Sequence, residues 1–185
     1  MQVPDSERLS FYLMNHNHAQ QLFELDQDPA VMKYINGGQK TSRADINNKF
    51  IPRVQSFTNP EQGWGLWGVK ITTNQKFIGW ILIRPMEFFT AQPEHNNLEI
   101  GWRFKQASWG KGYATEAANA VLNSVAEQTG VNTFSALADK DNKASINIMQ
   151  KLGMRYLKSY QHQGSQGEIS AVYYQLTADN SSLIK

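Results

Sequence analysis

The sequence predicts an α/β (α+β) fold, in which a mixed central sheet of about seven strands is flanked by about four helices. Segments with the period of a strand alternate with segments with the period of a helix from one end of the chain to the other. The chain has 185 residues, of which 41% are hydrophobic, and this composition suits one sizeable core. Because no repeat or low-complexity linker divides the sequence, we expect a single domain over residues 1–185.

The first third of the chain is predicted to hold one strand and two helices. Residues 8–13 alternate polar and apolar side chains, which is typical of a strand with one buried face. A short helix is expected over 19–25, and Asp28-Pro29 ends or interrupts it. A second helix over 43–57 must bend or split at Pro52, because proline lacks the N–H group that a helical hydrogen bond needs.

The middle of the chain is predicted to form three strands. Residues 65–71 and 77–83 are joined by a short polar turn, and the second of them is an almost unbroken apolar run. Such a run is typical of a strand that is covered on both faces. A loop is expected over 85–96, and a further strand over 98–104 contains Gly101.

The hydrophobic period then changes to that of a helix. Apolar side chains fall at i, i+4, i+7, i+8 and i+11 from Ala114, which predicts one face of a helix that starts near Tyr113 and stops at Gly130. The remaining segments alternate in the same way and predict a strand, a helix and two strands, over residues 133–137, 144–152, 154–160 and 169–176.

Composition argues against several classes of function. A formal net charge of +2 with 18% charged residues is too mild to indicate a nucleic-acid partner. The sequence has no cysteine, which excludes disulfides and thiolate metal sites, and we expect no metal. The sequence shows neither the pattern of a signal peptide nor an apolar run of roughly 20 residues. We therefore expect a cytoplasmic protein with no membrane partner.

One segment has the pattern of an anion-binding loop. The strand over 98–104 is followed by Trp109-Gly110-Lys111-Gly112-Tyr113 at the start of the long helix. The first N–H groups of a helix have no internal partner, the helix dipole adds positive charge there, and glycine lets the backbone approach a phosphate closely. Gly112 and Thr115 break the spacing of a Walker A loop and of a dinucleotide-binding loop, respectively. A tight turn that binds no ligand is the open alternative.

Residues 109–117, Trp-Gly-Lys-Gly-Tyr-Ala-Thr-Glu-Ala, resemble the pyrophosphate-binding motif of the GNAT N-acetyltransferases. The usual pattern is Gln/Arg-x-x-Gly-x-Gly/Ala, and Trp109 stands in the Gln/Arg place, as in the RimJ/RimL-like group. Asp-Asn-Lys-Ala-Ser at 141–145, with Met-Gln-Lys-Leu-Gly-Met at 149–154, resembles the Asn-x-x-Ser…Glu-Lys-Leu-Gly-Phe signature of the same group. Residues 7–9 and 77–80 agree as well, so the resemblance extends to about residue 177.

The resemblance implies that acetyl-CoA is the cosubstrate of a single N-acetyltransferase domain. Family members hold it between two parallel strands that splay apart, here 98–104 and 133–137, and Gly101 fits a bulge that opens them. The main chain of 102–104 would pair with the pantetheine amides, and that of 110–114 would hold the pyrophosphate. The implied cofactor-binding residues are Trp102, Arg103, Phe104, Trp109, Gly110, Lys111, Gly112, Tyr113, Ala114, Thr115, Asn142 and Ser145.

Acetyl transfer requires a neutral amine, a donor to the oxyanion and a proton for the thiolate. Glu99 is the predicted base, with an ordinary solvent-facing carboxylate as the alternative interpretation. Many family members carry a tyrosine acid where this chain has Met149, so Ser145 is predicted to act instead, by analogy with RimL-like enzymes. Asn142 and Ser145 are also good helix caps, and the two roles can coexist.

The acceptor implied by the resemblance is an amine, either a small molecule or a protein N-terminus. An α-amine has an ordinary pKa of about 8, against about 10.4 for lysine, and so needs less help from a base. Phe88 and Phe89 are expected either to flank the acceptor site or to pack in the core. Two other functions stay open, namely a non-catalytic acyl-CoA-binding or regulatory module on the same fold and a different nucleotide-binding enzyme. We expect a monomer or a homodimer.

Overall fold

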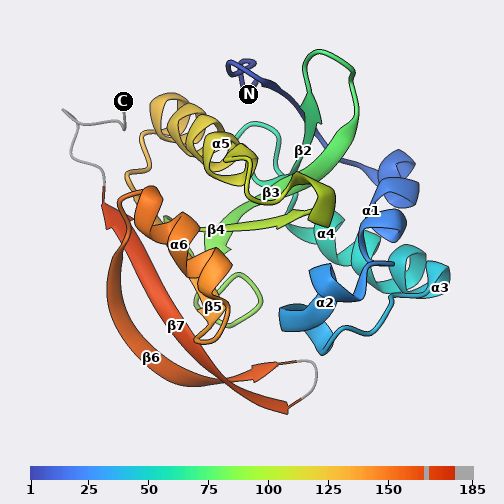
Figure 1. The fold of residues 1–185 in the computed structure, drawn as a ribbon. Coiled ribbons are helices and arrows are strands. Elements are labelled where there is room, and N and C mark those ends of the chain that lie inside the picture. The colour runs from blue at the N-terminus through green and yellow to red at the C-terminus, as the bar shows by residue number, and fades with distance from the viewer. Residues whose placement is uncertain (165–166, 178–185) are drawn as a thin grey trace.

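A seven-stranded mixed sheet forms the middle of the molecule, with helices on both of its faces (Figure 1). The computed structural model describes residues 1–164 and 167–177, so residues 178–185 of the predicted domain lie outside the described part. The strands lie in the order β1-β2-β3-β4-β5-β7-β6. Their bounds are Leu9–Leu13 (β1), Gly65–Ile71 (β2), Phe77–Met86 (β3), Glu94–Phe104 (β4), Thr133–Asp139 (β5), Arg155–Gly164 (β6) and Gly167–Thr177 (β7).

The sheet opens between β4 and β5, which form the one parallel pair among the described strands. Their pairing begins at Asn97↔Thr133 and ends at Glu99↔Ser135, although both strands continue beyond it. The remaining residues of β4 therefore face a gap instead of a neighbouring strand. This geometry confirms the predicted splayed parallel strands in the middle of the sheet.

The gap opens without the bulge that was predicted at Gly101. The pairing of β4 with β3 runs without a register shift from Phe104 back to Leu98, and Gly101 lies opposite Leu82 in regular register. The prediction of a bulge at Gly101 is therefore wrong. β5 stays paired with β7 along its whole length, so the sheet opens because β5 and β7 together diverge from β4, whose pairing with β3 is regular over residues 98–104.

One face of the sheet is covered by α5 (Tyr113–Thr129) and α6 (Lys143–Lys151), which pack over the larger of two hydrophobic clusters (Figure 1). Four members of the predicted stripe are fully buried, whereas Ala114 at its start is partly buried; the four are Ala118, Val121, Leu122 and Val125. Gly112 and Gly130 flank α5, and both have a positive φ of the left-handed region. Both predicted ends of this helix are confirmed.

The opposite face is covered by the helices of the first third of the chain (Figure 1). Their bounds are Ala19–Leu25 (α1), Pro29–Asn36 (α2), Arg43–Asp45 (α3) and Ile51–Phe57 (α4). A π-helical turn over Ile46–Phe50 joins α3 to α4, so the predicted helix over 43–57 is continuous but irregular. The irregular turn lies directly before Pro52, which has no N–H group to donate.

Two boundaries differ from the sequence prediction. The loop expected over 85–96 is confined to 87–93, because β3 reaches Met86 and β4 begins at Glu94. Residues 94–96 are exposed, so they carry no apolar alternation that could mark a strand. The structure also adds α2. When the continuous stretch from α3 to α4 is counted as one helix and short 3₁₀ turns are left out, the described part of the chain has five helices instead of about four. No described helix is long and apolar enough to cross a membrane.

Candidate functional site

A cavity of about 790 Å³ lies at the gap between β4 and β5. Its walls come from these two strands, from the start of α5, from α6 and, on the other side of the sheet, from α2. Almost all residues that the sequence marks as functional line it, and Lys111 is the exception. Those that line it are Glu99, Trp102, Arg103, Phe104, Trp109, Gly110, Gly112, Tyr113, Ala114, Thr115, Asn142 and Ser145.

The main chain of β4 presents polar groups to this cavity. The Lys105 N–H group donates to the Ile78 carbonyl of β3 at 2.8 Å. Because an antiparallel ladder alternates, the main-chain groups of Trp102 and Phe104 point away from β3 and toward the gap, whereas those of Arg103 point to β3. The Trp109 indole N–H donates to the Phe104 carbonyl at 2.9 Å. Trp102 is thus left with main-chain groups that a ligand in the gap can reach.

The loop between β4 and α5 has the conformation of an anion-binding turn. Gly110 and Gly112 have φ values of 73° and 79°, in the left-handed region that glycine adopts without strain. The first helical hydrogen bond of α5 runs from the Glu116 N–H group to the Gly112 carbonyl. The N–H groups of residues 113–115 therefore have no acceptor inside the helix and lie at its positive end.

An ion pair ties this loop to the N-terminal segment. The Arg8 guanidinium contacts the Glu116 carboxylate at 2.6 Å and also donates to the Lys111 carbonyl at 3.1 Å. Glu116 further accepts from the Ser6 hydroxyl and from the Arg8 N–H group. Burial raises the pKa of Glu116, but these hydrogen bonds and the Arg8 charge outweigh it and hold the pKa below its ordinary value. The Lys111 ammonium donates to the Ala107 carbonyl.

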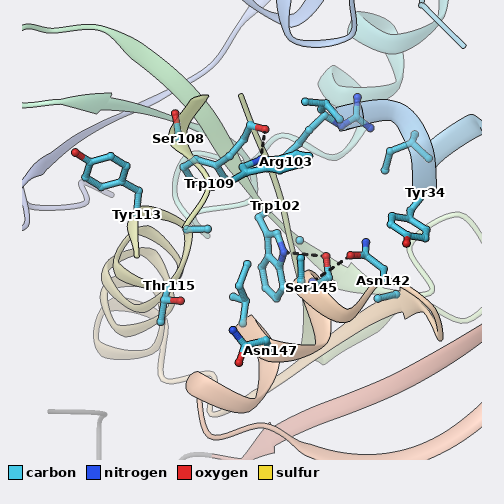
Figure 2. A pocket seen from close by; sticks show the side chains of 18 of the residues that line it. Tyr34, Trp102, Arg103, Ser108, Trp109, Tyr113, Thr115, Asn142, Ser145 and Asn147 are labelled. Carbon is cyan, nitrogen blue, oxygen red and sulfur yellow. Dashed lines mark hydrogen bonds between the residues drawn. The ribbon is translucent and has the colours of Figure 1, made fainter. Parts of the chain in front are cut away.

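Trp102, Asn142 and Ser145 meet on the α6 side of the cavity (Figure 2). The Asn142 side-chain oxygen accepts from the Ser145 N–H group at 3.1 Å, which confirms that Asn142 caps α6. The Ser145 hydroxyl accepts from the Trp102 indole N–H group at 3.3 Å. The hydroxyl hydrogen of Ser145 therefore stays available to a further acceptor, and Asn142 combines capping with a place in the cavity wall.

The side chain of Arg103 binds to other side chains inside the protein. Its guanidinium forms an ion pair with Asp26, and the two side chains are 10% and 5% exposed. Asp26 also accepts from the Thr41 hydroxyl, and the Arg103 guanidinium lies over the Trp80 ring. This buried pair fixes the end of α1 against β4 and so supports the cavity wall.

Glu99 lies where the parallel pairing ends, at the mouth of the gap. Its carboxylate oxygen Oε2 accepts from Nε of Arg84 at 2.7 Å, and the terminal nitrogen of Arg84 contacts the same oxygen at 2.7 Å. The Glu99 side chain is 15% exposed, so it is not the ordinary solvent-facing carboxylate of the alternative interpretation. Met149 is 1% exposed within the larger hydrophobic cluster and is not part of the cavity wall.

One wall of the cavity, formed by α2, was not predicted from the sequence. Tyr34 of this helix extends toward the α6 side, and its hydroxyl donates to the Asp141 carbonyl at 3.1 Å (Figure 2). The signals for α2 were present: Asp28 caps its first turn, Pro29 is its first residue and Gly37 ends it in the left-handed region. Asp28-Pro29 was interpreted as the end of one helix, although it begins the next.

Comparison with known proteins identifies the family. Residues 8–155 match the family model described as "Acetyltransferase (GNAT) domain". The chain therefore belongs to the GNAT family of acetyltransferases, as the motifs predicted. It is an acetyl-CoA-dependent acetyltransferase, and the predicted class of enzyme is confirmed.

Individual relatives agree with this assignment. YkkB of Bacillus subtilis, described as an uncharacterized protein, is 31% identical over 159 residues, which cover 83% of this chain and 86% of YkkB. Two solved structures share the fold. RimL, a ribosomal L7/L12 α-N-protein acetyltransferase in complex with coenzyme A, has a TM-score of 0.76 and 15% identity, covering 96% and 98% of the two chains. The aminoglycoside acetyltransferase AAC(6')-Ib with coenzyme A has a TM-score of 0.73 and 17% identity, covering 91% and 94%.

Proposed function

We propose that this enzyme transfers the acetyl group of acetyl-CoA to a primary amine by direct attack within a ternary complex, and that the acceptor is an α-amine. The observation that carries the proposal is the position of the cavity, which joins the α5 loop on one face of the sheet to Glu99 and α2 on the other. Both substrates can meet at the gap without a covalent enzyme intermediate.

The cofactor end of the site is assigned to the main chain. The N–H groups of residues 110–115 receive the diphosphate, because those of 113–115 have no acceptor inside α5 and those of 110–112 belong to the turn that leads into its positive end. The Trp102 carbonyl accepts from a pantetheine amide in the gap, which leaves the Trp102 N–H group for the reacting carbonyl. Asn142 and Ser145 lie beside the thioester. This arrangement binds the cofactor mostly through backbone donors, and glycine at positions 110 and 112 allows the backbone conformation that presents them.

The acceptor end supplies the acid–base chemistry. The neutral amine attacks the thioester carbonyl, so that a C–N bond forms, the C–S bond breaks and the amine proton passes to Glu99. The Trp102 N–H group donates to the oxyanion. Ser145 donates its hydroxyl hydrogen to the departing sulfur, because its oxygen already accepts from the Trp102 indole. Glu99 and Ser145 are thus the base and the acid of the proposed reaction.

An α-amine fits this site better than a lysine side chain does. Glu99 shares its carboxylate with Arg84, whose guanidinium already engages oxygen Oε2, so the carboxylate is not wholly free to take up the amine proton. An amine with an ordinary pKa of about 8 is partly neutral at physiological pH and requires only a weak base. The name of RimL, which shares the fold, describes action on a protein α-amine as well.

The test is a comparison of Glu99→Gln with the wild type. We expect kcat to fall by about 100-fold, since a positioned general base contributes about 10²–10⁴. The dissociation constant of acetyl-CoA, measured by titration calorimetry, stays within twofold because Glu99 contacts the acceptor and not the diphosphate. Glu127→Gln, an exposed change on α5, is the matched control. An unchanged kcat in Glu99→Gln removes Glu99 from the mechanism. Binding of acetyl-CoA without turnover of any amine supports the non-catalytic alternative.

A further inference from the structure

Beside Glu99, at residues that do not themselves line the cavity, two guanidinium groups lie around one aromatic ring. Arg84 of β3 lies opposite Glu99 of β4 in the sheet, and the ion pair between them is largely buried, with 19% and 15% of the side chains exposed. A second guanidinium, that of Arg53 on α4, lies beside this pair. Its carbon atom Cζ is 3.6 Å from the centroid of the Phe89 ring, and Cζ of Arg84 is 5.2 Å from the same centroid. Both guanidinium groups thus lie close to the same aromatic ring, that of Phe89.

Among the described residues, Glu99 is the one carboxylate that forms an ion pair with either of the two guanidinium groups, those of Arg53 and Arg84. Arg53 takes part in none of the ion pairs found among the described residues, whereas Arg84 is paired with Glu99. Burial and the Arg84 charge lower the pKa of Arg53, and the Glu99 charge partly opposes them. Like charges repel each other, so an additional anion placed between Arg53 and Arg84 would be stabilised.

A second carboxylate, that of Glu87, lies two residues before Phe89 in the chain. Burial and then the charges of Glu87 and Glu99 raise the pKa of Tyr160 on β6. Among the ion pairs of the described residues, Arg84 is paired with Glu99 and not with Glu87. The ring of Phe89, 44% exposed, is open to an entering molecule.

We propose that Arg53 and Arg84 form an anion subsite over Phe89, and that the acceptor is an amine that carries a carboxylate close to its amino group. The inference rests on the proposed function, because it takes Glu99 as the base that the amine approaches. Arginine binds a carboxylate through paired N–H donors, and an aromatic floor supports its planar group. The acceptor class is then an acidic amino compound or a protein N-terminus with an acidic residue directly after the first.

The same geometry disfavours polycationic acceptors. A polyamine or an aminoglycoside brings several ammonium groups, which would lie against two guanidiniums that share a single carboxylate. The fold alone does not distinguish these acceptors, since it is shared with an aminoglycoside acetyltransferase and with a protein N-terminal acetyltransferase. The local charge does distinguish them, even though the formal net charge of the chain is only +2.

The experiment uses two matched series of acceptors with saturating acetyl-CoA and measures release of free CoA. One series is three peptides that differ only in their second residue, Ser-Asp, Ser-Asn and Ser-Lys. The other is the α-amide of aspartic acid against the α-amide of asparagine, two small α-amines that differ only in the side-chain carboxylate. We expect kcat/KM for the carboxylate member of at least one series to exceed that of the neutral member about tenfold. In that series Arg53→Gln reduces the ratio to below about threefold, and Arg53→Glu reverses it.

Lys49→Gln is the control, because it removes one positive charge from the same helical stretch at a position that is 79% exposed and paired with Asp45. We expect it to leave both ratios unchanged. Two results overturn the anion subsite while leaving amine acetylation intact: neutral or cationic acceptors turned over as fast as anionic ones, or a carboxylate preference that survives Arg53→Glu. Absence of turnover for every acceptor, with acetyl-CoA bound, overturns the proposed function itself and the subsite with it.

Discussion

The ion pair that anchors the α5 loop leads to a prediction for Glu116→Gln. The carboxylate of Glu116 accepts from the Ser6 hydroxyl, from the Arg8 N–H group and from the Arg8 guanidinium, and its side chain is 18% exposed. Glutamine keeps the shape but loses the charge, and its amide N–H₂ faces the Arg8 donors. Because the Arg8 side chain is 43% exposed, water screens part of the interaction. The expected loss is about 1–2 kcal/mol of unfolding free energy.

This loss has a measurable thermal signature and a definite pH dependence. For a domain of this size about 1 kcal/mol corresponds to roughly 2–4 °C, so Tm should fall by roughly 2–8 °C at pH 7. The folded-state pKa of Glu116 is lowered, so its contribution is fully present above the unfolded pKa of about 4.3 and is lost as pH falls through the folded value. The Tm difference between wild type and variant should be constant from pH 6 to 8 and shrink below about pH 4.3.

The assay is differential scanning fluorimetry across pH 3.5–8, with Glu127→Gln on the same helix as the control. The exposed control should lie within about 0.5 kcal/mol of the wild type at every pH. The dissociation constant of acetyl-CoA should rise in Glu116→Gln, because Arg8 then no longer holds the Lys111 carbonyl in place. A Tm difference that grows as pH falls, or that equals the difference of the control, refutes the assigned role of Glu116.

Three further substitutions test the α5 loop, the buried ion pair of Arg103 and the contact of α2 with the far side of the cavity. Gly112→Ala places a side chain at a φ of 79°, and it should lower Tm by about 2–4 °C and weaken acetyl-CoA binding in calorimetry at least tenfold. Gly130→Ala, at a φ of 76° on the other end of α5, is its control and should lower Tm by the same amount without changing acetyl-CoA binding. Asp26→Asn leaves the buried Arg103 charge unpaired and should lower Tm by roughly 6 °C or more in a thermal scan. Tyr34→Phe removes the hydrogen bond from α2 to the far side of the cavity and should raise the acetyl-CoA dissociation constant up to about fivefold, with Tm nearly unchanged.

Much of the fold was predictable because it depends on local pattern. The period of α5 and the glycines at its ends are set by the chain itself, and the structure confirms both. The strand β4 was predicted only from residue 98, because residues 94–96 are exposed and the strand begins where Glu94 pairs with Met86 of β3. The bulge at Gly101 was inferred from the residue type, whereas the gap depends on how β5 and β7 pack, which no local pattern records.

The site likewise has a part that the sequence predicts and a part that it does not. The residues of the α5 loop share one short motif, and the structure brings them to a single cavity. The Ser145 contact with the Trp102 indole and the stacking of Arg53 on Phe89 join residues that are far apart in the sequence. Such contacts depend on how helices pack across a sheet, so a single sequence without a structure cannot predict them.

The central claim is that the diphosphate of acetyl-CoA binds to main-chain N–H groups at the start of α5. The most direct measurement is a crystal structure of the protein with coenzyme A or acetyl-CoA. We predict diphosphate oxygens within hydrogen-bonding distance, about 2.7–3.2 Å, of N–H groups of residues 110–115, and the pantetheine arm in the gap between β4 and β5. A cofactor bound elsewhere with these N–H groups turned to water, or a gap closed by side chains at saturating cofactor, would contradict the claim.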